Sequence, residues 1–202
     1  MSQAVTDTHV AEEDLLRADL YDFLAALLAN PPSKDLLQHA AALGGDESDL
    51  GQAISTLARV ARATNAGAVE SEFNALFIGL GRGELMPFAS YYLTGFLNEK
   101  PLASLRADMA ALRITRAPNV YEPEDNIASL LEMMAGMIRG RFGEPVSLQK
   151  QKDFFFTHIA AWAEHFFSDL EAAQNSVLYA PVGTVGKAFL EIETQAFRMG
   201  AD

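Results

Sequence analysis

Three carboxylates, Glu122, Glu124 and Asp125, lie close together around Pro123 and are followed by Asn126. Neighbouring carboxyl groups can act as acid and base in catalysis, or they can pair with the guanidinium groups of a bound peptide. Acidic side chains in the first turn of a helix also stabilise it through its dipole, by about 0.3–1 kcal/mol each. This segment alone therefore leaves a binding role and a structural role equally open.

A second candidate segment is apolar. Phe73, Leu76 and Phe77 fall on one helical stripe, and the chain then enters a glycine-rich stretch from Gly79 to Gly83. The glycine stretch lacks the Lys-Ser/Thr pair of a nucleotide-binding loop and follows a helix rather than a strand, so we interpret it as a flexible turn. An apolar surface beside fixed negative charge suits a peptide that carries arginines and a hydrophobic run.

Other catalytic arrangements are not evident. The four histidines, His9, His39, His158 and His165, form no metal-ligand motif, although the last two would lie on similar faces of one predicted helix. We interpret them as core or rim residues. No serine–histidine or lysine-centred arrangement can be built from the spacing. We therefore expect no catalytic residue, no metal and no cofactor.

The composition excludes several classes of function. With no cysteine, the chain has no disulfide, thiol nucleophile or cysteine-ligated metal, which fits a reducing compartment. Its net charge of -12 repels nucleic acid and anionic lipid and attracts cationic partners. The N-terminus lacks the pattern of a secretory signal, and no window reaches the roughly 18 apolar residues of a membrane helix. We expect a cytoplasmic protein without nucleic-acid binding or stable membrane insertion.

Apolar residues recur at helical spacing through nearly every long segment, and no alternating strand pattern is found. The predicted helices, about nine to ten in all, lie around residues 16–29, 33–44, 50–65, 73–78, 90–93, 101–112, 127–138, 155–166 and 185–199. We expect an all-α helical bundle over residues 10–200 after a flexible segment at 1–9. Two prolines, Pro118 and Pro123, interrupt the pattern and predict a hinge near 116–124 between an N-terminal part, 10–115, and a C-terminal part, 125–200.

Over most of its length the chain resembles the TorD/DmsD/NarJ family of cytoplasmic chaperones for molybdenum-containing enzymes. The order and spacing of its motifs carry the resemblance: Glu72-Phe73-x-x-Leu76-Phe77-x-Gly79, Gly83-Glu84 with Pro87 and Ser90-x-Tyr92, Pro101-Leu102-x-x-Leu105-Arg106, Glu122-Pro123-Glu124-Asp125, Trp162, and Phe166-Phe167-x-Asp169-Leu170.

The resemblance implies a TorD-like helical fold of two parts joined at a hinge. It also implies a role in binding an apo-molybdoenzyme, often through its twin-arginine signal peptide, until the cofactor is inserted. The residues expected to bind this client are Phe73, Leu76, Phe77, Pro87, Tyr91, Tyr92, Glu122, Pro123, Glu124, Asp125 and Asn126. Family members usually have histidine where this chain has Asn126, so a step that needs a titrating imidazole there, including nucleotide binding, is not carried over.

Two alternatives to a chaperone stay open at this point. One is a structural subunit of an oxidoreductase complex, and the other is a helical enzyme that uses Asp125 with His158 or His165 in a pocket between the two parts. The client is also open among formate dehydrogenase, which the Gly83-Glu84 and Glu122–Asp125 segments weakly favour, nitrate reductase and the sulfoxide or amine-oxide reductases. A hinge would permit either a monomer or a domain-swapped dimer.

Overall fold

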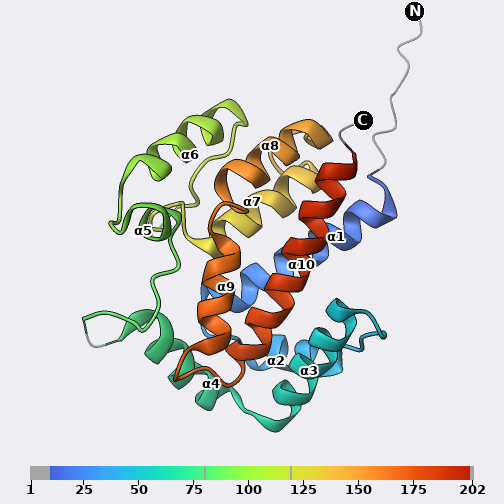
Figure 1. Ribbon diagram of the computed structural model, residues 1–202, viewed down its shortest axis with the longest axis vertical. Coiled ribbons are helices and arrows are strands. Elements are labelled where there is room, and N and C mark those ends of the chain that lie inside the picture. The colour runs from blue at the N-terminus through green and yellow to red at the C-terminus, as the bar shows by residue number, and fades with distance from the viewer. Residues whose placement is uncertain (1–9, 80, 119, 201–202) are drawn as a thin grey trace, which may run out of the picture.

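The computed structural model describes residues 10–79, 81–118 and 120–200 and shows an all-helical protein (Figure 1). The flexible segment predicted at 1–9 lies outside these residues. In the described part there are ten α-helices, one π-helical turn and no strand, which confirms the predicted fold class. The helices are α1 (Glu12–Ala29), α2 (Lys34–Ala42), α3 (Asp49–Ala63), α4 (Ala66–Phe73), α5 (Ala89–Thr94), α6 (Lys100–Ala111), α7 (Ile127–Arg139), α8 (Leu148–His158), α9 (Ala163–Ala172) and α10 (Tyr179–Met199).

Side-chain caps explain where several helices begin. Ser33, Ser48, Asn65 and Asn126 each accept a hydrogen bond from a backbone N–H in the first turn of the helix that follows. These bonds satisfy N–H groups that have no partner within the helix. The start of α2 after Ser33 agrees with the helix predicted around 33–44.

The structure corrects one predicted helix, because the aromatic stripe at 155–166 belongs to two helices. The chain leaves the helical path at Ile159, and α9 starts after Trp162. The indole Nε1 of Trp162 donates to the His158 carbonyl at 2.8 Å, so a buried side chain satisfies a carbonyl that the end of α8 leaves unpaired. His158 and His165 consequently lie on different helices rather than on one.

The last helix also begins earlier than expected. The pattern predicts a helix around 185–199, but α10 starts at Tyr179, and Ala180 and Pro181 lie in its first turn. Proline is tolerated there because the first N–H groups of a helix have no intrahelical acceptor.

One core joins helices from both sides of segment 116–124. α1 packs against α7, and α10 packs against both α9 and α3. The largest fully buried side chains belong to helices throughout the chain and include Tyr21, Trp162, Phe166 and Tyr179. The two predicted parts therefore share one hydrophobic core in this structure, and a hinge near 116–124 stays a prediction.

A buried charge cluster ties α1 to α10. Glu193, only 1% exposed, accepts hydrogen bonds from Arg17 Nε at 2.7 Å, Arg17 Nη2 at 2.8 Å and the Tyr21 hydroxyl at 2.8 Å. Burial and the negative charge of Glu193 raise the pKa of Tyr21 well above its ordinary value. Tyr21 is therefore a neutral hydrogen-bond donor at any physiological pH.

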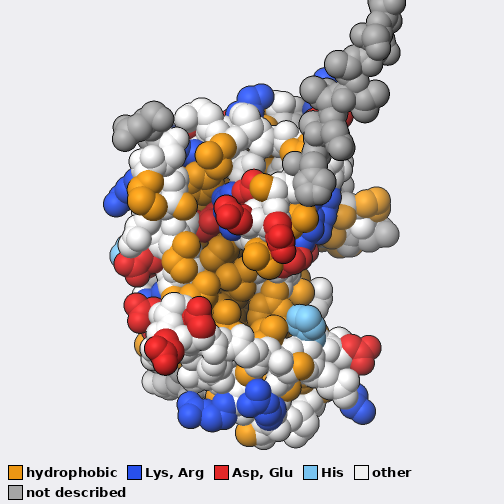
Figure 2. Space-filling view, turned by 90° about the vertical axis from the view of Figure 1, so that its right-hand side faces the viewer, with side chains coloured by type: hydrophobic (Ala, Val, Ile, Leu, Met, Phe, Trp, Pro, Cys, Tyr) orange, Lys and Arg blue, Asp and Glu red, His pale blue; other side chains and the backbone are white. Residues whose placement is uncertain are grey.

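Hydrophobic side chains also gather at the surface. Figure 2 shows them in a hollow on the face over which α1, α3 and α10 lie, with acidic side chains above and below it. Among the described residues no helix has the length and apolar character needed to cross a membrane.

Candidate functional site

A cleft of about 320 Å³ lies between α1, the end of α6, the connection from α6 to α7, and α7. We call it the connection cleft. Its apolar lining consists of Ala26, Met109, Ile114, Ala117, Val120, Met133 and Phe142. Its charged lining consists of Asp22, Arg116, Glu122, Glu124, Glu132 and Arg141. Two predicted site residues, Glu122 and Glu124, thus stand at an apolar cleft, although none of the predicted apolar residues Phe73, Leu76 and Phe77 lines it.

Some of these carboxylates form ion pairs within the protein. Glu124 accepts from Arg106 Nη2 at 2.8 Å and lies 3.5 Å from Arg116 Nε. Burial acts to raise the pKa of Glu124, but the hydrogen bond and charge of Arg106, with a smaller effect of the Arg116 charge, outweigh it and keep the pKa below its ordinary value. Asp22 pairs with Arg139 and with Arg141, whose Nη1 lies 2.9 Å away.

Two other carboxylates of the cleft are less engaged. Glu122 is exposed, and its side chain accepts only a long 3.4 Å hydrogen bond from Asn126 within the described part of the chain. Glu132 makes no hydrogen bond or ion pair with any described residue. Arg116 donates to the carbonyls of Tyr121 and Glu122 and so holds the connection in place. The cleft therefore offers uncompensated negative charge next to apolar walls.

The predicted residues Pro87, Asp125 and Asn126 are brought together, but inside the fold. The Ile127 N–H donates to the Pro87 carbonyl at 2.9 Å, and the Ala89 N–H donates to the Asp125 carbonyl at 3.0 Å. Asp125 is 1% exposed and its Oδ2 accepts from the Ser90 N–H at 2.7 Å, while Asn126 caps α7. In this conformation these residues fix the start of α7 and are too buried to contact a client protein directly.

The predicted apolar stripe is mostly core. Phe73 and Leu76 are buried, which corrects the expectation that they form an open surface, and Phe77 is half-buried. The Phe77 ring packs edge-on against Phe73 at 4.9 Å and Tyr179 at 5.4 Å between centroids. The motif coincides with the π-helical turn Asn74–Ile78. Such turns are rare and recur at functional sites.

Gly83 and Glu84, which follow this turn, both have structural roles. A Cβ on Gly83 would lie 2.5 Å from the backbone carbon of Phe77, so no larger residue fits. Glu84 accepts from the N–H groups of Gln174 at 2.7 Å and Asn175 at 3.2 Å. The hydrogen bond from the Gln174 N–H is the main cause that lowers the pKa of Glu84. The Gly-Glu motif thus joins this loop to the segment before α10.

Glu72 anchors the start of α10 in the same manner. Its carboxylate accepts from the backbone N–H groups of Val177 at 2.7 Å, Leu178 at 3.1 Å and Tyr179 at 2.8 Å. We expect Glu72→Ala to lower the free energy of unfolding by about 1.5–3 kcal/mol, because hydrogen bonds to a charged acceptor are lost. Urea denaturation measures the loss, and hydrogen exchange should become faster at 177–179. Glu70→Ala, an exposed change on the same helix, is the control, and equal stability of the two variants would refute this role.

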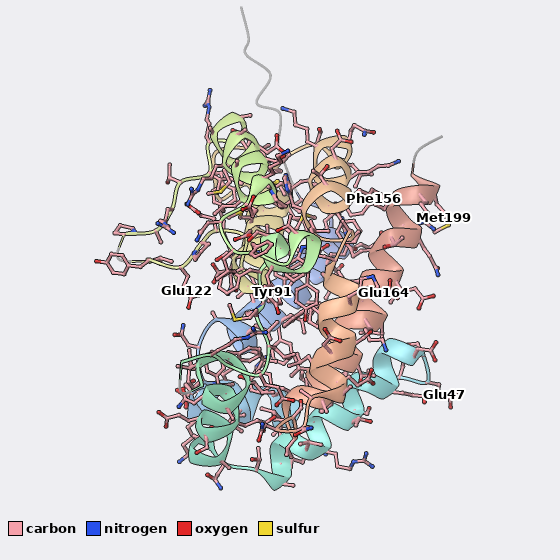
Figure 3. The ribbon with its side chains drawn as sticks, turned by 60° about the vertical axis from the view of Figure 1, so that its left-hand side comes forward. Glu47, Tyr91, Glu122, Phe156, Glu164 and Met199 are labelled. Atoms are coloured by element: carbon pink, nitrogen blue, oxygen red, sulfur yellow. The ribbon has the colours of Figure 1, made fainter. Side chains whose placement is uncertain are left out.

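The two predicted tyrosines lie on α5, apart from the connection. Tyr91 accepts a hydrogen bond from Arg82 at 2.8 Å, whereas Tyr92 donates to Asp169 at 2.8 Å and packs against Trp162. Burial, followed by the hydrogen bond to Asp169, raises the pKa of Tyr92. Figure 3 shows Glu122 at the edge of the molecule and Tyr91 nearer its centre. The predicted residues thus occupy several places rather than one site.

The sequence reasoning missed the other walls of the cleft. Asp22 and Ala26 come from α1, Met109 from α6, and Glu132 and Met133 from α7. No spacing rule connects residues more than 100 positions apart, and each of these fits an ordinary amphipathic helix. Only the packing of α1 on α7 brings them together.

The enzyme alternative relies on Asp125 with His158 or His165, and these residues lie outside the connection cleft. His158 Nε2 lies 2.7 Å from Asp108 Oδ2, and His158 and Asp125 both line a separate cavity of about 190 Å³. His165 is exposed on α9. Within the described ranges, no group of three or more His, Asp or Glu side chains is placed to hold a metal ion.

The fold is shared with redox enzyme maturation proteins. A solved structure from Archaeoglobus fulgidus, described as a candidate redox enzyme maturation protein, matches 95% of this chain and 99% of its own, with a TM-score of 0.56 and 20% identity. The family model described as nitrate reductase delta subunit matches residues 44–168. The chain belongs to this family, which is the TorD/DmsD/NarJ family of chaperones.

Relatives named chaperone protein TorD extend the similarity. One from Vibrio cholerae serotype O1, El Tor Inaba strain, is 27% identical over 195 residues, which are 87% of this chain and 89% of the relative. One from Aliivibrio salmonicida is 24% identical, covering 89% and 93%. Another, from the classical Ogawa strain of V. cholerae, is 28% identical over 128 residues, covering 60% of this chain and only 58% of that relative. A family of chaperones, rather than of enzymes, leaves the enzyme alternative without support.

Proposed function

We propose that this protein is a system-specific cytoplasmic chaperone. It binds an apo-molybdoenzyme, together with its twin-arginine signal peptide, during cofactor insertion and before export or assembly. Family membership supports the general role. The proposed binding mode rests on the connection cleft. There apolar walls meet two carboxylates, Glu122 and Glu132, that lack a close partner in the described part of the chain. The structural-subunit alternative differs from this proposal in that a subunit stays in the mature complex.

The cleft suits a segment that is both apolar and cationic. Side chains buried against Met109, Ile114 and Met133 would contribute about 25 cal/mol per Å² before the costs of ordering. Arginines would pair with carboxylates at the rim, such as Glu122, and would set the direction of the bound segment. The overall negative charge would speed the encounter with a cationic client.

The other predicted residues have supporting roles in this proposal. Phe73 and Leu76 hold the π-helical turn, and Pro123, Asp125 and Asn126 hold the connection against α7. Phe77, Tyr91 and Tyr92 are partly exposed and extend the aromatic surface that a larger client could contact.

Charge reversal tests the electrostatic contribution. A triple reversal of Glu122, Glu124 and Asp125 is unsuitable, because Asp125 is buried and Glu124 is paired. We expect Glu122→Lys alone to weaken binding of a signal peptide about tenfold, since an exposed pair contributes up to about 1 kcal/mol and reversal adds repulsion. Fluorescence anisotropy at low and high salt measures the affinity and its salt dependence.

The matched control is Glu47→Lys, an exposed reversal far from Glu122 in Figure 3. It makes the same change in net charge. If the two variants bind alike, the effect is one of overall charge and Glu122 has no specific role. Unchanged affinity in Glu122→Lys would remove the electrostatic contact from the proposal.

The proposed function itself is tested by purification of the tagged chain from native cytoplasm, with mass spectrometry and metal analysis of the retained proteins. A cofactor-poor molybdoenzyme precursor supports the chaperone and identifies the client, with formate dehydrogenase one candidate. Mature, cofactor-loaded enzyme would instead indicate a structural subunit. Size-exclusion chromatography of the same material distinguishes a monomer from a domain-swapped dimer.

A further inference from the structure

Glu132 is a carboxylate of the connection cleft with no evident role in stabilising the fold. It comes from the middle of α7 and lines the cleft beside Met133, yet it makes no hydrogen bond or ion pair within the described residues. The neighbouring Asp22 is paired with Arg139 and Arg141. Glu132 is exposed to solvent, so its carboxylate needs no partner within the fold and is available to a ligand in the cleft.

The groups that face Glu132 explain its electrostatics. Asp22 of α1 and Arg141 after α7 are the charged groups that act on its pKa, while Arg116, Glu122 and Glu124 line the cleft from the connection. Burial, and then the charge of Asp22, raise the pKa of Glu132, and Arg141 offsets this only in part. The ionised carboxylate is thus disfavoured in the unbound protein, and a cation placed in the cleft would relieve this.

We propose that Glu132 binds an arginine side chain of the client segment inside the connection cleft. This inference rests on the proposed function and identifies the residue that selects the ligand. Arginine fits better than lysine, because its planar guanidinium forms two parallel hydrogen bonds to a carboxylate and stacks on an aromatic ring, and Phe142 also lines the cleft. The apolar lining would cover the methylene groups of the same side chain.

The other acidic residues are less suited to this role. Glu124 is held by Arg106, Asp22 by two arginines, and Asp125 is buried against Ser90. Glu122 lies in the connection, where its side chain already accepts a hydrogen bond from Asn126. Like Glu122, Glu132 is exposed, but it lines the cleft beside Met133 and makes no hydrogen bond or ion pair within the described part of the chain.

The proposal couples binding to proton release. In the unbound protein Glu132 keeps its proton to a higher pH than an ordinary glutamate, whereas a bound arginine favours the carboxylate and lowers its pKa. Between the pKa of the complex and that of the unbound protein, binding therefore releases a proton. Affinity should rise with pH across this window and become constant above it.

Calorimetry with a synthetic peptide tests this. The peptide carries two arginines followed by an apolar run, and titrations in two buffers of different ionisation enthalpy measure the protons released. We expect the wild-type protein to release protons at mildly acidic pH and to bind a lysine-substituted peptide at least fivefold more weakly. Glu132→Gln should lose proton release, the preference for arginine and at least fivefold in affinity.

Two controls separate the possible failures. Glu191→Gln, an exposed change away from the cleft, should retain both proton release and affinity, and thermal melting should show that Glu132→Gln stays folded. If Glu132→Gln binds and releases protons like the wild type, Glu132 is not the arginine ligand, although the chaperone proposal stands. If the wild type does not bind the peptide, this inference fails, and purification of the client then decides separately whether the proposed function fails as well.

Discussion

Glu193→Ala is expected to lower the free energy of unfolding by about 3–5 kcal/mol. The carboxylate is buried, and it holds both Arg17, through two nitrogens, and the Tyr21 hydroxyl. Its removal leaves the partly buried Arg17 guanidinium with Asp14 as its remaining carboxylate partner. Removal of one partner from such a cluster costs more than the whole cluster contributes, because the remaining charge loses its compensation.

Chemical denaturation monitored by circular dichroism measures this effect. Glu191→Ala is the matched control, since Glu191 lies on the same helix but is exposed, and it should change stability by no more than about 0.5 kcal/mol. A loss below about 1 kcal/mol in Glu193→Ala would show that water or a shift of α10 compensates Arg17. The link between α1 and α10 would then be weaker than its geometry indicates.

Trp162→Ala is expected to produce a loss of similar size, about 3–5 kcal/mol. Trp162 is fully buried and packs against Tyr92 and Phe166, with ring centroids at 5.2 and 6.0 Å. Truncation leaves a large cavity and also removes the donor to the His158 carbonyl at the break between α8 and α9. The lost burial and the lost hydrogen bond act in the same direction.

Trp162→Phe separates these contributions. It keeps much of the ring volume but cannot donate to His158, so it should lose about 1–3 kcal/mol. Thermal melting ranks the three proteins. If alanine and phenylalanine at this position are equally destabilising, the hydrogen bond dominates over packing.

The sequence predicts the helices well because their signals are local. The apolar spacing of Ile127, Leu130, Leu131 and Met134 depends only on neighbours along α7, and the Ser33 cap acts within one turn. The break between α8 and α9 has no such signal, since no proline or glycine marks it and the indole of Trp162 stabilises it through a buried contact. Local patterns thus predict which segments are helical, but not where tertiary contacts interrupt them.

The candidate site was only partly predictable for the same reason. Glu122 and Glu124 stand out because they flank Pro123 in a connection, and both reach the cleft. Asp125 has the same local setting, but its hydrogen bond to Ser90 buries it. Glu132 looks like the polar residue of an amphipathic helix, and only the approach of α1 shows that it faces a cleft.

The packing of α1 on α7 also bears on the order in which the protein can be made. The first helix finds its main partner more than 100 residues later, and α10 must then return to α3. A chain emerging from the ribosome therefore has no complete surface on which to bury α1 until α7 is out, and such contacts between distant segments form slowly. The cleft, which needs Asp22 and Met133 together, can accept a client only after the chain has been synthesised through α7 and as far as Phe142.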